Sequence, residues 1–293
     1  MRGLLIFCLC FFSEATIGQT LYILGTLQDG GAPHMGCEKL CCSVEKPHDF
    51  VSSIGVVGEH QSFIFDATPD FVSQTNYLKE VSGHKNVVIF LTHAHMGHYT
   101  GLMHLGREAH NTAETMVYAM PKMAHFLSKN GPWDQLVSLR NISLIPLQED
   151  QEVFLDQSIT VTPLKVPHRD EYSETVGYLI KGKNKTALYV PDIDKWSKWN
   201  RSIAALIETV DYAFLDGTFF ADGEVPRPMS EVPHPFVSET AALLESLPLK
   251  ERQKVYFIHL NHSNPARNAE FQGRIDLEKQ GFQFAEFGLS FDL

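Results

Sequence analysis

The 293-residue sequence lacks an apolar run long enough to cross a membrane, since none reaches the roughly 18 to 20 residues that a transmembrane helix needs. It also has little positive charge, with 24 Lys and Arg against 35 Asp and Glu and a formal net charge of -11. No basic stripe interrupts this acidic balance, which argues against a nucleic-acid binder. No internal repeat and no linker rich in Pro, Gly and Ser divides the chain, so we expect one globular domain.

Residues 1–18 have the order of a secretory signal peptide. Arg2 precedes an apolar run at 3–12, and small and polar residues follow this run. A buried first strand or helix is the disfavoured alternative, because residues 21–24 supply a better first strand. We therefore expect a secreted or periplasmic protein whose mature single domain is 19–293.

Short β-branched and aromatic runs bounded by turn residues predict strands at 21–24, 51–57, 62–66, 87–92, 116–119, 158–165, 175–180, 186–190, 212–216 and 255–259. Helical spacing between them predicts helices at 71–80, 101–108, 121–130, 199–208, 238–246 and 266–279. Strands outnumber helices, and several neighbouring strands have no helix between them. An alternating βαβ sheet is therefore disfavoured, and the pattern predicts an α+β fold of two mixed sheets with helices outside.

Fourteen histidines are the most unusual feature of the composition. Three of them, His93, His95 and His98, lie within six positions directly after the apolar run 87–91. His93 and His95 point to the same side of an extended segment, and a turn into the next helix brings His98 to the same point. Neutral imidazoles that converge in this way bind Zn²⁺ or Fe²⁺. Three separately solvated histidines are the disfavoured alternative.

The mature chain has three cysteines, Cys37, Cys41 and Cys42, an odd number that cannot all pair within one chain. Neighbouring Cys41 and Cys42 are poorly placed to pair with each other. A disulfide with Cys37 and a metal site that uses two or three thiolates both stay open.

The segment His93-Ala94-His95-Met96-Gly97-His98 resembles the HxHxDH signature of the metallo-β-lactamase fold. Gly97 stands where that superfamily usually has an aspartate. Three further candidate ligands follow in the order of the superfamily, each one to three residues after a predicted strand: His168, Asp192 and His259. The resemblance implies a four-layer αββα sandwich with its ligands on loops at one edge.

A narrower resemblance covers most of the mature chain. Segments similar to the coenzyme PQQ synthesis protein B branch lie at 30–37, 176–178, 216–220, 259–265 and 281–293. That branch tends to depart from hydrolase ligands at the positions of His168 and Asp192, and this chain keeps both. The resemblance therefore implies a relative of that branch rather than a member with the same role.

The resemblance implies one or two Zn²⁺ ions at the active site, with Fe²⁺ or Mn²⁺ as alternatives. The first metal would be held by His93, His95 and His168. Asp192 would bridge to the second metal, and His98 and His259 would complete the ligands of that second metal. Asp192 and His259 are also the catalytic candidates. Such a pair of ions lowers the pKa of a water between them and polarises the bond that is attacked.

Gly97 leaves the second metal with three protein ligands at most. Three outcomes are open: the second site is weak, a side chain from elsewhere such as His34 replaces the aspartate, or the protein uses one metal.

The cysteines also resemble a feature of the phosphodiesterase branch that acts on phosphonate-pathway esters. Like that branch, the chain has a cysteine cluster near the N-terminus and a second histidine after the metal histidine. This resemblance implies a structural zinc site of Cys37, Cys41, Cys42 and His262. The alternative is free or disulfide-bonded cysteines and a solvated histidine.

Three functions are consistent with these observations. The first is an exported metal-dependent hydrolase that cleaves an ester, phosphodiester or lactone of a small molecule. The second is a metal-dependent oxygenase, as the PQQ-related resemblance suggests, with one redox metal on His93, His95 and His98. The third is a non-catalytic metal-binding protein that lost its chemistry with Gly97. Fold and ligands do not determine the substrate.

Overall fold

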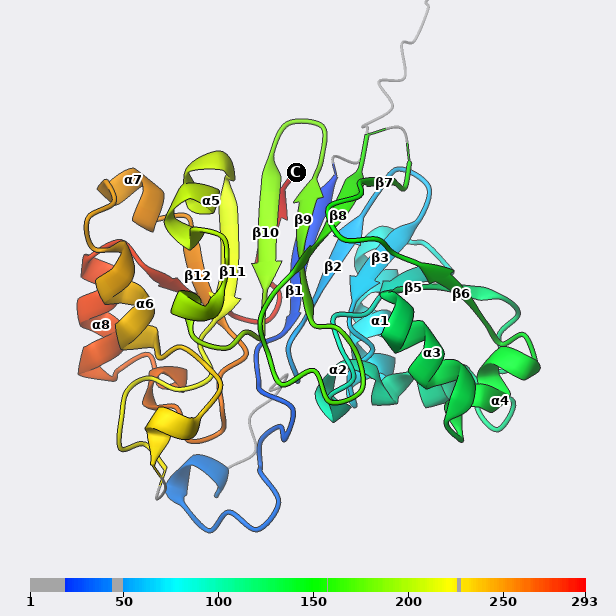
Figure 1. Cartoon of the computed structure of the whole chain (residues 1–293), viewed down its shortest axis with the longest axis horizontal. Helices are drawn as coiled ribbons and strands as arrows, with labels where there is room; N and C mark the ends of the chain where they lie inside the picture. Colours follow the sequence, from blue (N-terminus) through cyan, green and yellow to red (C-terminus); the bar gives the residue numbers. More distant parts are fainter. Residues whose placement is uncertain (1–18, 44–49, 157, 226–227) are drawn as a thin grey trace, which may run out of the picture.

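The computed structural model describes residues 19–43, 50–156, 158–225 and 228–293. Within them, two seven-stranded mixed sheets pack face to face and helices cover their outer faces (Figure 1). This four-layer αββα sandwich confirms the predicted α+β fold. The signal-peptide prediction lies outside the described residues. Each helix within the described residues is too short or too polar to span a bilayer.

The first sheet has the strand order β14-β1-β2-β3-β4-β5-β6. Its strands are β1 (Thr20–Gly25), β2 (Ser53–Val57), β3 (Ser62–Phe65), β4 (Val87–Phe90), β5 (Thr115–Ala119), β6 (Ile142–Pro146) and β14 (Ser290–Asp292). Its outer face is covered by α1 (Phe71–Ser82), α2 (Met96–Tyr99), α3 (Pro121–Lys129) and α4 (Trp133–Ser138). Local sequence sets the ends of these helices: α1 is followed by Gly83 at a left-handed φ of 73°, and α3 begins with Pro121.

The second sheet has the order β13-β12-β11-β10-β9-β8-β7. Its strands are β7 (Val153–Phe154), β8 (Thr160–Lys165), β9 (Val176–Lys181), β10 (Thr186–Val190), β11 (Tyr212–Asp216), β12 (Val255–Ile258) and β13 (Gln283–Phe284). Its helices are α5 (Ile203–Thr209), α6 (Val237–Leu244), α7 (Leu249–Arg252) and α8 (Gln272–Lys279).

The main core lies between the sheets, and a further core lies under each helical layer. In β3, Phe63 and Phe65 face the second sheet, whereas Ile64 between them packs under the helices. In β10, Tyr189 faces the first sheet and Leu188 the outer layer. Successive side chains of a strand point to opposite faces, so strands buried on both faces read as continuous apolar runs. This is why the inner strands stand out in the sequence.

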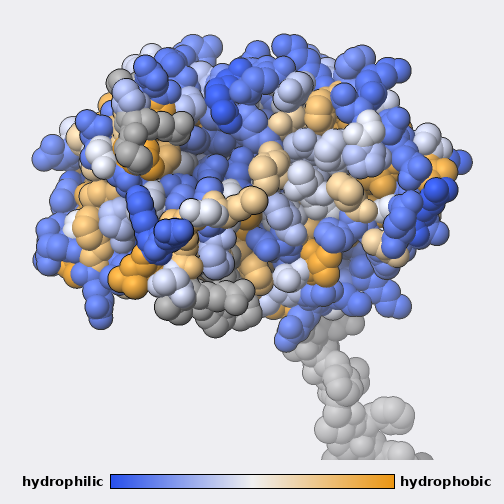
Figure 2. Space-filling model, turned by 90° about the horizontal axis from the view of Figure 1, so that it is seen from below, coloured by the Kyte–Doolittle hydropathy of each residue, from blue (hydrophilic) through white to orange (hydrophobic). Residues whose placement is uncertain are grey.

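The pairing directions bring several strand ends to one edge of the sandwich. In the first sheet, β3 and β4 are parallel, and β1 runs with them because it is antiparallel to β2. In the second sheet, β10, β11 and β12 are parallel, and β8 runs with them because both β8 and β10 are antiparallel to β9. The carboxyl ends of these strands lie at the bottom of Figure 1. Figure 2 views this face, where hydrophobic residues are scattered among polar ones.

Candidate metal centre

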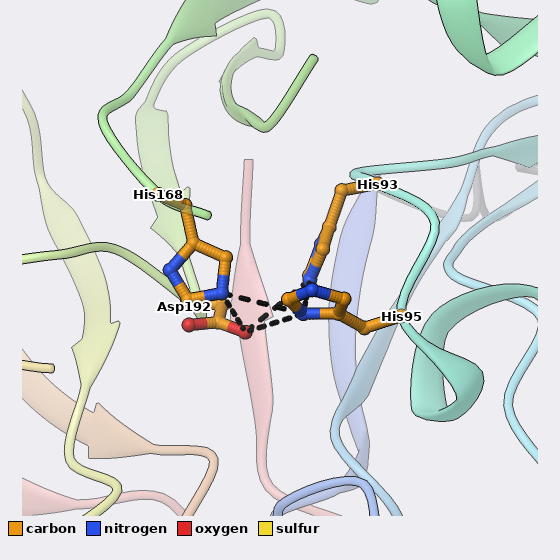
Figure 3. A group of neighbouring side chains, drawn as sticks. All are labelled: His93, His95, His168 and Asp192. Carbon is orange, nitrogen blue, oxygen red and sulfur yellow. Dashed lines mark hydrogen bonds and ion pairs between the residues drawn. The ribbon is translucent and has the colours of Figure 1, made fainter. Parts of the chain in front are cut away.

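One group of four ligand atoms gathers after β4, β8 and β10. The side chains of His93, His95, His168 and Asp192 place these atoms within 4.8 Å of one another, and Figure 3 shows the histidines turned toward the aspartate. Asp192 Oδ2 lies 3.3 Å from His93 Nε2, 3.4 Å from His168 Nε2 and 3.9 Å from His95 Nδ1. His95 Nδ1 lies 2.8 Å from His93 Nε2 and 3.3 Å from His168 Nε2.

These distances fit a tetrahedral metal ion. Zn²⁺ with bonds of about 2.0 to 2.1 Å holds its ligand atoms about 3.3 Å apart. Three of the five separations are 3.3 to 3.4 Å, and the other two, 2.8 and 3.9 Å, lie on either side. Three imidazole nitrogens and one carboxylate oxygen are donor types that Zn²⁺ binds in proteins. The donor set therefore fits a metal.

Neighbouring side chains turn the histidine lone pairs toward this point. Nδ1 of His93 contacts Oγ1 of Thr92 at 3.0 Å, which leaves Nε2 for a metal. Nε2 of His95 contacts the Glu171 carboxylate at 3.0 Å, which leaves Nδ1. Such contacts fix the tautomer and the ring orientation of a ligand histidine.

Burial keeps two of these histidines in the form that binds metals. It lowers the pKa of His93 well below the usual range, and His98 adds to this effect. Burial also lowers the pKa of His168, against the opposing charge of Asp192. Both rings are therefore neutral at pH 7, as metal ligands must be.

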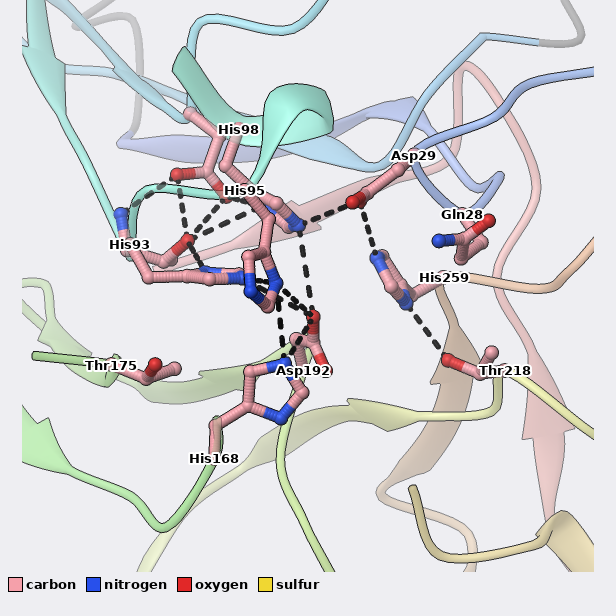
Figure 4. A network of polar contacts seen from close by, with 12 residues as sticks. Gln28, Asp29, His93, His95, His98, His168, Thr175, Asp192, Thr218 and His259 are labelled. Carbon is pink, nitrogen blue, oxygen red and sulfur yellow. Dashed lines mark hydrogen bonds and ion pairs between the residues drawn. The ribbon is translucent and has the colours of Figure 1, made fainter. Parts of the chain in front are cut away.

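A second group lies beside the first and contains a residue that the sequence analysis did not identify. Asp29 Oδ1 lies 3.1 Å from His98 Nε2 and 3.4 Å from His259 Nε2, and the three ligand atoms lie within 4.8 Å of one another. His98 Nε2 is also 3.9 Å from Asp192 Oδ2, so the two groups adjoin (Figure 4). Asp29 follows β1 directly before two glycines, and a search for carboxylates just past strand ends would have found it.

Asp66, at the end of β3, positions His98. Its Oδ2 lies 2.7 Å from Nδ1 of His98, and its Oδ1 accepts hydrogen bonds from the backbone N–H and the hydroxyl of Thr92. The backbone of this buried aspartate has a φ of 72°, and that of His259 has a φ of 64°. Left-handed conformations at non-glycine residues persist where the surrounding contacts demand them, and they cluster at functional sites.

His234, from the loop before α6, is a second residue that the sequence analysis did not identify. Its Nδ1 lies 2.9 Å from Asp216 Oδ2 and 3.1 Å from Asp192 Oδ1. Burial opposes its charge, but Asp216 and Asp192 outweigh this and raise the pKa of His234 to about 10. The ring is therefore an imidazolium at pH 7, placed against the aspartate of the first group.

Asp216 orients His259 through Thr218. Its Oδ1 accepts hydrogen bonds from the backbone N–H and the hydroxyl of Thr218. The Thr218 hydroxyl lies 2.9 Å from His259 Nδ1. This chain of contacts leaves Nε2 of His259 directed at Asp29.

The three cysteines come together in the loop before β2. Cys41 Sγ lies 3.9 Å from Cys37 Sγ and 4.0 Å from Cys42 Sγ, close to the roughly 3.8 Å between thiolates on a tetrahedral zinc with bonds of about 2.3 Å. His262 is not part of this group of ligand atoms within the described residues. It stacks on His34 at 4.0 Å between ring centroids, and the His34 backbone N–H donates to Cys42 Sγ.

A family model described as a beta-lactamase superfamily domain matches residues 61–260, more than half of the chain. The chain belongs to the β-lactamase superfamily. This superfamily member is similar over most of its length to proteins named coenzyme PQQ synthesis protein B. The relative from Methylorubrum extorquens is 26% identical over 302 residues, which cover 92% of this chain and 99% of the relative. The relative from Nitrosococcus oceani is 24% identical over 312 residues, which cover 92% and 98%.

Solved structures confirm the metallo-β-lactamase fold of this superfamily member. Zn²⁺-bound PqqB from Methylobacterium extorquens matches with a TM-score of 0.79 at 21% identity, over 94% of this chain and 100% of that chain. A diphosphatase from the PhnP family matches with a TM-score of 0.66 at 23% identity, over 94% and 97%. Human tRNase Z, short form, matches with a TM-score of 0.56 at 15% identity, over 93% and 98%.

The structure of this superfamily member brings all six predicted active-site ligands to one edge, in two adjoining groups. It places Asp29, and not His34, beside His98 and His259. His34 was one candidate to replace the missing aspartate, and the structure does not place it there, because its ring stacks on His262 instead.

Proposed function

We propose that this protein is a metal-dependent hydrolase of a small-molecule ester, with phosphodiesters as the first substrate class to test. The observation that carries the proposal is the group of His93, His95, His168 and Asp192, whose spacing fits a tetrahedral metal ion. Membership of the β-lactamase superfamily and the likeness to a diphosphatase of the PhnP family support it. Zn²⁺ is the ion we propose, and the Zn²⁺-bound PqqB structure supports that choice.

When bound, two such ions supply a water that is acidic enough to act as a nucleophile near pH 7, and they polarise the bond under attack. The side chains of the protein supply the rest. Asp192 places its negative charge between the two groups. His234 Nδ1 lies 3.1 Å from Asp192 Oδ1 and helps to orient this carboxylate.

Arg169 gives a reason to test phosphodiesters first. Its guanidinium lies 3.1 Å from the ring of His95, and its side chain is half exposed. A guanidinium there offers paired, charge-assisted hydrogen bonds to the oxygens of a phosphate group. A neutral lactone or carboxylic ester has no matching charge.

The test is elemental analysis of the mature protein, purified without added metal or chelator, beside a His93→Ala, His95→Ala variant. We expect the variant to lose at least one zinc ion per chain and to lose hydrolysis of bis-(p-nitrophenyl) phosphate, because two of four ligands of the first group are gone. A His110→Ala, His125→Ala variant is the control, since both side chains are exposed and lie outside the ligand groups.

Two other outcomes would overturn the proposal. Iron near one ion per chain would favour the oxygenase. Absence of metal from both proteins, with no hydrolysis, would favour a role without metal catalysis.

We also propose that Cys37, Cys41 and Cys42 hold a structural zinc ion, in a protein exported by its first eighteen residues. Export favours this assignment because unpaired thiols are uncommon outside the cytosol unless they bind a metal. Burial and the neighbouring His34 lower the pKa of His262 to about 4, which keeps its ring neutral and available as a fourth ligand after a side-chain rearrangement.

A Cys41→Ser, Cys42→Ser variant should lose one zinc ion per chain and unfold at a lower temperature than the parent, because metal binding to a folded site stabilises that fold. Elemental analysis and thermal denaturation measure the two effects. Ser43→Ala, at an exposed position in the same loop, is the control. An unchanged zinc content, or a disulfide detected by mass spectrometry, would contradict the zinc assignment.

A further inference from the structure

Gly97 is a glycine for a steric reason. A Cβ atom at this position would lie 2.4 Å from Oδ1, 2.6 Å from Cα and 2.7 Å from Cγ of Asp29. The backbone itself does not require glycine, because Gly97 lies in α2 and is not among the glycines with positive φ. Glycine in a helix even lowers the stability of the helix relative to alanine. The volume that a side chain at position 97 needs is therefore filled by Asp29.

Asp29 is held in this position by backbone pairing. The backbone N–H of Gln28 donates to the carbonyl of Leu260, and the N–H of Leu260 donates to the carbonyl of Thr26. These bonds tie the segment after β1 to the residue that follows His259. The turn is closed by a hydrogen bond from the Gly31 N–H to the Gln28 carbonyl, and Gly31 has a φ of 62°. Asp29 is therefore fixed beside His259 before any ion binds.

The two histidines present the nitrogen that a metal would use. His98 contacts Asp66 through Nδ1, and His259 contacts Thr218 through Nδ1. Both Nε2 atoms face Oδ1 of Asp29, at 3.1 and 3.4 Å. The Nε2 atom of His98 is buried and makes no hydrogen bond of normal geometry. A buried polar atom of this kind needs a partner, and a metal ion shared with Asp29 would provide one.

We propose that Asp29 is the carboxylate ligand of the second metal and replaces the aspartate that Gly97 lacks. The inference rests on the proposed two-metal centre. Asp29, His98, His259 and the adjoining Asp192 then give the second ion four protein ligands, a mixed set of imidazole and carboxylate that suits Zn²⁺. The carboxylate comes from the loop after β1 rather than from position 97 in α2, and glycine at 97 makes room for it.

The test is an exchange of the two positions. Asp29→Asn removes the charge and keeps the shape, and we expect a loss of about 100-fold or more in affinity for one of the two active-site ions. Gly97→Asp alone places two carboxylates in one volume and should also lower the affinity for this ion. The combined Asp29→Gly, Gly97→Asp variant removes the contacts with Oδ1 and Cγ but keeps the contact with Cα at 2.6 Å, so it should regain only part of the affinity for the second active-site ion. Asp134→Asn, exposed on α4, is the control.

Metal content is measured after equilibration with a competing chelator, and the absorption spectrum of the cobalt-substituted protein reports the ligands directly. Both readouts are independent of activity. Retention of both ions at unchanged affinity in Asp29→Asn would overturn the inference and leave the hydrolase proposal standing. Loss of one ion in a protein without hydrolytic activity would support the inference and count against the hydrolase. A parent protein that binds one active-site ion at most would overturn the inference together with the two-metal centre.

Discussion

An Asp192→Ala variant is expected to lose both active-site ions and at least about 1000-fold of hydrolytic kcat/KM. The Asp192 carboxylate contacts His93 and His168 in the first group and lies 3.9 Å from His98 in the second. It is buried, and water cannot easily take its place. Its removal therefore deprives both groups of their shared negative charge.

The same substitution has a consequence for the metal-free protein. Asp192 and Asp216 together hold the imidazolium of His234. Without Asp192, the buried positive charge of His234 keeps only one of its two carboxylate partners. The metal-free variant should therefore also unfold at a lower urea concentration than the metal-free parent. Elemental analysis, steady-state kinetics and urea denaturation measure the three effects. Asp276→Ala, exposed on α8, is the control. A variant that keeps both ions would contradict the bridging position of Asp192.

A Phe90→Ala variant is expected to lose about 3 to 5 kcal/mol of unfolding free energy. Phe90 ends β4 and is fully buried between the sheets. Its ring stacks on Tyr118 at 4.5 Å and on Phe65 at 5.1 Å between centroids. Aromatic side chains dominate such cores, and their removal leaves a cavity that the rigid sheets cannot close.

Urea denaturation at pH 7 measures this loss, and Phe154→Ala is the matched control. Phe154 is 75% exposed at an edge of the second sheet, so its removal should change stability by about 0.5 kcal/mol or less. Phe90→Leu should cost less than Phe90→Ala, because it leaves a smaller cavity. Equal effects at positions 90 and 154 would show that the packing between the sheets is not what stabilises the fold.

The strands that the sequence predicts are the inner strands of both sheets. Its apolar runs correspond to β1 to β5 and β8 to β12, and each of these strands has a neighbour on both sides. The four strands that sequence analysis did not predict, β6, β7, β13 and β14, are the edges of the two sheets. Edge strands are often short and partly exposed, and two of these span two residues each. Such segments carry too little pattern to be recognised.

Some helices are predicted closely from the sequence, and others differ in type or length. The spacing predicts α1 and α3 closely, because each has an amphipathic run and a clear terminal residue, Gly83 after α1 and Pro121 at the start of α3. The helix expected at 101–108 is instead a 3-10 segment over Thr100–Leu105. A helix expected at 266–279 begins only at Gln272, after a separate turn at Pro265–Arg267. Helix propensity indicates that these regions are helical, and tertiary packing decides the type and length of each helix.

The sequence by itself determined the inner strands and the α+β class, because apolar runs leave a local pattern. Its resemblance to the metallo-β-lactamase fold indicated the αββα sandwich and six candidate ligands just past predicted strands. Only the tertiary structure decided which distant loops share an edge. It placed Asp29 against Gly97, His234 against Asp192 and Asp66 against His98. These are single polar residues in loops, without a repeating pattern. Their roles arise from the pairing directions of strands far apart in the chain, which the order of residues along one segment does not record.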